Sequence, residues 1–148
     1  MKKIFISKKA QKHSSKGDFG KGKNGKLILI GGGHGQENID FLNKKKIDNN
    51  VTLLYNNGVQ IGNVSNHRRR KNRECSGQCW FPKEWSKKDI KKAGQYVMGL
   101  KKNSERTNQI PHWGTVNKVK VGVYTKNGFV KSIFPCYFQK GGVKNEKL

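Results

Sequence analysis

The chain has 148 residues, and its 32 lysine and arginine residues against nine aspartate and glutamate residues give a formal net charge of +23. This length is enough for one hydrophobic core but hardly for two, and no segment approaches the ~18 consecutive apolar residues of a membrane span. Three tryptophans, four tyrosines and seven phenylalanines lie in short apolar blocks, which argues against a disordered chain. The charge predicts a polyanionic partner.

The first 25 residues are rich in lysine, serine and glycine, and we expect a flexible basic arm at 1–25 followed by a folded domain at 26–148. No apolar core or cleavage site typical of a signal peptide is found in this arm. The run from Lys26 to Ile30 is apolar and closed by three glycines, so it predicts a buried strand. Residues 37–46 predict a short helix.

A hairpin and a helix follow. Residues 51–64 predict two strands joined at Asn57-Gly58, a dipeptide that favours tight turns. Ser86 begins the clearest helix, which extends to Met98, and Asp89 completes a capping box with it. We therefore expect a helix between two antiparallel regions.

The last third of the chain predicts a second hairpin. Alternating valines at residues 119–123 and the apolar run at 129–134 flank the turn dipeptide Asn127-Gly128. A two-residue turn opposes Val123 to Ser132 and Val121 to Phe134, so that Ser132 and Phe134 share a face. The fold class predicted is α+β, with small antiparallel sheets flanked by helices.

Several kinds of chemistry are disfavoured. The few carboxylates form no dense cluster, as a two-metal nuclease needs, and the glycine-rich segment lacks the Gly-Lys-Ser/Thr of a phosphate-binding loop. A zinc site would have to combine Cys75, Cys79, Cys136 and His67, but these lack paired Cys-x-x-Cys spacing. We expect reduced thiols, and neither a metal nor another cofactor.

The histidines are the best candidates for catalysis. His34 lies in Gly31–Gly35, where bare backbone would let a polyanion approach, and His67 precedes the cationic run 68–73. His13 and His112 are interpreted as surface or packing residues. Two imidazoles can cleave RNA without a metal: one removes the proton of a ribose 2′-hydroxyl, and the other protonates the departing 5′-oxygen. A lysine or arginine would stabilise the transition-state charge.

Four segments resemble the EndoU-like endoribonucleases, in particular the bacterial EndoU toxin domains of contact-dependent growth inhibition and other polymorphic toxins. They are the glycine-rich segment around His34, the segment 62–67 that ends at the second histidine, the block 77–86 (GQCWFPKEWS), and the hairpin 127–135 (NGFVKSIFP). The resemblance runs from about Gly31 to Tyr137. It implies two small antiparallel β-sheets flanked by helices, with an active-site cleft between them.

The resemblance implies a His-His-Lys triad that yields a 2′,3′-cyclic phosphate end. His34 and His67 match the two histidines, without a decision on which is base and which is acid. Lys71 matches the lysine by its position before the Phe-Pro block, and Arg73 is a close competitor.

The resemblance also implies a base-binding pair near the C-terminus, at Ser132 and Phe134. Many members of the family have tyrosine at the second position, so uridine preference is not carried over, whereas an aromatic surface for base stacking is.

By resemblance to the toxin branch, we expect RNA, in particular tRNA, as substrate and an acidic immunity protein as partner. The protein would be secreted or surface-delivered, without stable membrane association, and would act in the cytoplasm of a target cell. Two alternatives remain open at this point: a non-catalytic basic RNA-binding module and a membrane-active basic protein.

Overall fold

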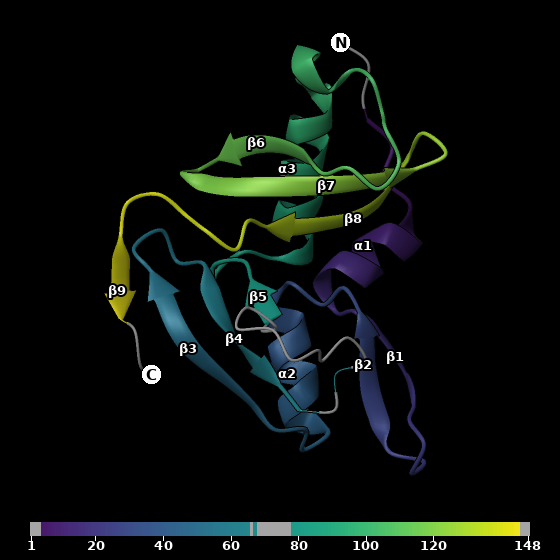
Figure 1. Ribbon diagram of the computed structural model, residues 1–148, viewed down its shortest axis with the longest axis vertical. Helices are drawn as coiled ribbons and strands as arrows, with labels where there is room; N and C mark the ends of the chain where they lie inside the picture. Colours follow the sequence, from purple (N-terminus) through teal and green to yellow (C-terminus); the bar gives the residue numbers. More distant parts are fainter. Residues whose placement is uncertain (1–3, 66, 68–77, 146–148) are drawn as a thin grey trace.

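The computed structural model describes residues 4–65, 67 and 78–145, and the fold is α+β (Figure 1). The helices are α1 (Lys8–Ser15), α2 (Gln36–Lys44), α3 (Lys87–Gly99) and the short 3₁₀ helix η1 (Lys101–Asn103). The strands are β1 (Asp18–Lys21), β2 (Leu27–Gly31), β3 (Asn49–Tyr55), β4 (Gln60–Val64), β5 (Gln78–Trp80), β6 (His112–Val116), β7 (Val119–Lys126), β8 (Phe129–Pro135) and β9 (Val143–Asn145).

The described strands form three antiparallel sheets, with the orders β1-β2, β5-β4-β3-β9 and β6-β7-β8. In Figure 1, the three-stranded sheet and α3 occupy the upper part, the other two sheets and α2 the lower part, and α1 lies between them. The larger hydrophobic core joins α3 to the three-stranded sheet through residues such as Val97, Val121 and Ile133. A smaller core around Leu29 and Trp80 lies among α2, β2 and the four-stranded sheet.

The N-terminal segment differs from the flexible arm predicted for residues 1–25. Residues 8–15 form α1, whose Ser7 cap accepts a hydrogen bond from the Ala10 amide at 3.1 Å. Ile6 and Ala10 are buried in the larger core, and β1 pairs with β2. A few buried side chains therefore order a segment whose lysines had suggested disorder. The pairing of β1 with β2 forms the two-stranded sheet.

Three of the predicted local elements are confirmed. The strands β3 and β4 pair around the Asn57-Gly58 turn. Helix α2 buries Ile39 and Leu42. Helix α3 begins at a complete capping box, in which Ser86 Oγ accepts from the Asp89 amide at 3.2 Å and an Asp89 carboxylate oxygen accepts from the Ser86 amide at 2.8 Å.

The second hairpin forms as predicted, but the predicted register is wrong by one residue beyond the turn. Lys126 opposes Phe129, whereas Ser132 opposes Tyr124 and Phe134 opposes Gly122. An irregularity between Tyr124 and Thr125 inserts the extra residue, as a β-bulge does. Ser132 and Phe134 consequently share a face with Tyr124 and Gly122 in place of the predicted valines.

Candidate active site

A pocket of about 630 Å³ is bounded by the β7–β8 hairpin, the end of α1 and the segment after β2. The hairpin contributes Tyr124, Thr125, Lys126, Lys131, Ser132 and Phe134. The opposite side contributes His13, Gly31, Gly32 and His34, and the loop before β6 contributes Asn108 and Gln109. The described residues thus bring two histidines, two lysines and an aromatic surface to one pocket.

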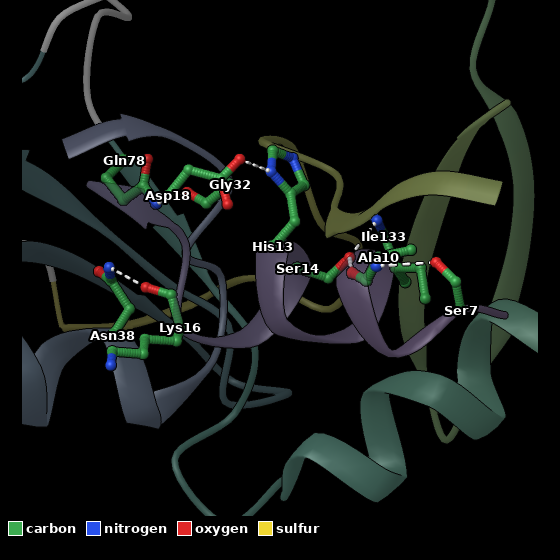
Figure 2. A network of polar contacts seen from close by, with 10 residues as sticks. All are labelled: Ser7, Ala10, His13, Ser14, Lys16, Asp18, Gly32, Asn38, Gln78 and Ile133. Atoms are coloured by element: carbon green, nitrogen blue, oxygen red, sulfur yellow. Dashed lines mark hydrogen bonds and ion pairs between the residues drawn. The ribbon is translucent and has the colours of Figure 1, made fainter. Parts of the chain in front are cut away.

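The two histidines are held together by the way α1 ends. The last carbonyl groups of a helix lack partners within it and must bond elsewhere. The carbonyls of His13, Ser14 and Ser15 accept hydrogen bonds from the amides of residues 33, 34 and 35 at 2.8, 2.6 and 3.0 Å. Lys16 O accepts from Asn38 Nδ2 at 2.8 Å (Figure 2). The segment that carries His34 is therefore bonded along its length to the residues that carry His13.

The glycines before His34 make this close approach possible. Gly32 has φ +67°, and a Cβ there would overlap the carbonyl oxygen of His13; Gly33 has φ +77°, and its Cβ would overlap the Asn38 side chain. The sequence interpretation placed a polyanion against this bare backbone. In the structure, α1 and α2 occupy much of that space, while Gly31 and Gly32 also line the pocket.

His34 is half-buried, and its Nδ1 lies 2.8 Å from the carbonyl oxygen of Cys79 on β5. Because a carbonyl oxygen only accepts, Nδ1 carries the proton, and Nε2 is the nitrogen with the free lone pair in the neutral ring. Burial lowers the pKa of His34 to about 4; the Cys79 hydrogen bond raises the pKa, and the nearby charges of His13 and His67 lower it further. At neutral pH, His34 is an uncharged imidazole suited to accept a proton.

His13 is the site residue that the sequence reasoning missed. It lies in the last turn of α1, lines the pocket with His34, and its Nδ1 is 2.6 Å from an Asp18 carboxylate oxygen (Figure 2). The carboxylate accepts a hydrogen bond from Nδ1 and orients the ring, an arrangement found in acid–base catalysis. The helix that carries His13 could have been found from its cap at Ser7. No local pattern, however, links position 13 to the loop around position 34.

Phe134 and Ser132, the pair singled out by the resemblance, both line the pocket. The Phe134 ring is 5.0 Å from the Tyr124 ring, nearly parallel at 25°, and its centroid is 6.1 Å from that of His34. Next to Ser132, the Ile133 amide donates to Ser14 Oγ at 2.9 Å, which fixes β8 against α1 (Figure 2). An aromatic surface thus lies directly beside the histidines.

A comparison of the sequence with known protein families adds a separate finding. The family model described as bacterial EndoU nuclease matches residues 7–137 of the chain. The chain belongs to the bacterial EndoU nuclease family. The match begins just before α1 and so includes both His13 and the β7–β8 hairpin. No curated protein and no solved structure gives a significant match.

Of the other candidates of this EndoU nuclease, His67 does not line the pocket and the rest lie outside the described residues. His67 forms an isolated parallel bridge with Leu29 of β2, and it is close enough for its charge to affect His34, but it is not among the residues that line the pocket. Lys71, Arg73 and Cys75 lie outside the described residues. The structure therefore brings His34 together with Ser132 and Phe134, and adds His13.

In the described part of the chain, no group of three or more histidine, cysteine or acidic side chains is arranged to hold a metal ion. Burial raises the pKa of the Cys79 thiol to about 12, and its sulfur lies 3.5 Å from Pro135 O. Cys79 therefore stays protonated.

No helix in the described ranges is both long and apolar enough to cross a membrane.

Proposed function

We propose that this EndoU nuclease cleaves RNA by transphosphorylation, without a metal, and leaves a 2′,3′-cyclic phosphate. The observation that carries the proposal is the pair of imidazoles in one pocket, His13 and His34, each with Nδ1 bound to an oxygen acceptor. In both rings, Nε2 is then the nitrogen left for proton transfer. One site thereby holds a candidate base and a candidate acid.

His34 is the base in this proposal, since its depressed pKa of about 4 keeps Nε2 unprotonated at neutral pH. It takes the 2′-hydroxyl proton as the 2′-oxygen bonds to phosphorus. His13, with Asp18 as counter-ion of its imidazolium form, gives a proton to the 5′-oxygen as the bond between phosphorus and that oxygen breaks. The products are the cyclic phosphate and a free 5′-hydroxyl.

The transition-state charge needs a cation. We keep Lys71 in this role, with Arg73 as its competitor, on the resemblance of the sequence. We also keep His67 as the alternative partner of His34, because its charge reaches that ring. Pocket lining favours His13 over His67 as the second imidazole.

The substrate is proposed from the pocket and the charge. Phe134 offers a ring on which a base can stack, and the buried Ser132 hydroxyl lies beside it to contact the base edge. A net charge of +23 attracts RNA of any sequence. By resemblance, we propose tRNA as the physiological substrate, interbacterial competition as the setting, delivery to the target-cell cytoplasm, and an acidic immunity protein as the inhibitor.

The test is cleavage of tRNA and of single-stranded RNA in EDTA by the wild type and three single variants, His13→Ala, His34→Ala and His67→Ala. We expect the first two variants to lose roughly 10²–10⁴-fold in rate and the third to lose far less. Equal activity in all four proteins contradicts the proposal. Loss in His67→Ala with full activity in His13→Ala restores the pairing suggested by the sequence.

A non-catalytic RNA-binding module is the second candidate, and the charge alone favours it equally. Such a module would retard RNA in a gel and leave it intact in every variant. End mapping of the products by their 2′,3′-cyclic phosphate distinguishes the proposed transphosphorylation from hydrolysis that leaves a 5′-phosphate.

A further inference from the structure

The loop before β6, residues 104–111, is bound firmly to the end of the β7–β8 hairpin. Asn108 Oδ1 accepts from the Asn127 amide at 2.9 Å, and Asn108 forms a parallel bridge with Thr125. The Arg106 guanidinium donates to Gly128 O at the turn. These contacts fix the loop over the hairpin end of the pocket.

Gln109 is held at the pocket in a conformation that non-glycine residues rarely adopt. Its φ is +63°, its side chain is exposed, and it lines the same pocket as His34. Its side-chain amide makes no hydrogen bond to any described residue. Strained backbone of this kind persists where neighbouring structure imposes it, and it is concentrated at functional sites. The anchored loop therefore presents a free donor and a free acceptor to whatever occupies the pocket.

Gln109 lies away from Phe134, the residue on which we propose that a first base stacks. Phe134 lies opposite Gly122, whereas the loop contacts Thr125, three residues further along β7, a distance of about 10 Å in a strand. The two exposed pocket lysines, Lys126 and Lys131, are at this end as well. The pocket thus continues from the aromatic surface to an amide flanked by cations.

We propose that Gln109 reads the base of a second nucleotide, adjacent to the one that stacks on Phe134, while Lys126 and Lys131 contact the phosphate of that second nucleotide. This subsite rests on the ribonuclease activity proposed above. A glutamine amide matches the paired donor and acceptor of adenine, and unstacked RNA bases expose such edges. Adenine is therefore the base expected in the subsite.

The experiment uses single-stranded RNA with randomised neighbours on both sides of a fixed nucleotide, and the cut ends are sequenced. The wild type should enrich adenine at one neighbouring position, and Gln109→Ala should reduce that enrichment roughly tenfold. Gln109→Glu, which only accepts, should move the preference to cytosine, whose amino group donates. The matched control is Asn117→Ala, an exposed amide at φ +48° outside this pocket, and it should leave the preference unchanged.

The outcomes separate the two proposals. Cleavage by the wild type without preference at either neighbour, or the same preference in Gln109→Ala, overturns the subsite and leaves the ribonuclease activity standing. No cleavage by the wild type contradicts the ribonuclease activity itself. A preference for adenine that is lost in Gln109→Ala and kept in Asn117→Ala supports the subsite.

Discussion

The low pKa of His34 makes the stability of the fold depend on pH in a way that one substitution can isolate. In the unfolded chain His34 has its ordinary pKa of 6.5, and in the folded protein burial lowers this value to about 4. Between these values the unfolded state binds a proton that the folded state does not. Stability therefore falls as pH decreases from 6.5 towards 4 and changes no further, on account of this group, below that range.

The size of the effect follows from the pKa difference. The difference between the two pKa values lowers the free energy of unfolding by about 3 kcal/mol at pH 4 and by almost nothing at pH 7. His34→Gln removes the titrating group while its amide can still donate to the Cys79 carbonyl. Urea unfolding of both proteins at a series of pH values measures the difference in unfolding free energy. We expect the wild type to lose about 3 kcal/mol more than the variant between pH 7 and pH 4.

A difference in unfolding free energy between the two proteins that stays constant across this pH range would show that His34 does not titrate differently in the folded and unfolded states. A second measurement is independent of unfolding. The ring protons of His34, followed by NMR, should titrate with a midpoint near pH 4, and a midpoint at or above the ordinary value of 6.5 would show that the imidazole is not desolvated as the structure indicates.

Three further predictions concern the site and the fold. Asp18→Asn should lower the rate of RNA cleavage by less than His13→Ala does, without loss of thermal stability, because the carboxylate orients the imidazole from a half-exposed position; equal rates in wild type and Asp18→Asn would contradict this. Gly62→Ala should destabilise the protein by about 1–3 kcal/mol, measured by thermal unfolding, since a Cβ there would overlap a carbonyl oxygen of β3. As the control, a Cβ at Gly99 would contact no neighbouring atom, so Gly99→Ala should change stability by less than about 0.5 kcal/mol. Ser86→Ala removes the helix cap of α3 and should cost about 1 kcal/mol, measured by chemical denaturation.

The elements that could be predicted from the sequence are those determined by adjacent residues. Ser86 and Asp89 specify the start of α3 within four positions, and each Asn-Gly dipeptide specifies a hairpin turn. The register beyond the second turn could not be predicted, because the irregularity after Tyr124 has no local signature in the chain.

The candidate site shows the same limit. That Phe134 and Ser132 share a face was predictable because a strand places alternate residues on one face, and the resemblance alone selected them as site residues. His13 was not, because α1 is short and rich in lysine, and most of its stability comes from contacts of Ile6 and Ala10 with distant segments. Its place in the pocket became visible only when the structure brought position 13 beside position 34.

Two consecutive pieces of chain build the site, one ending with α1 and the other containing residues 33–38, and hydrogen bonds join them. A break in the turn between β1 and β2, at residues 22–25, would leave His13 with one fragment and His34 with the other. Each fragment would also lack the partners for the carbonyls or amides that now bond to one another. Neither fragment alone would hold both imidazoles, so restored RNA cleavage on mixing would report their association directly.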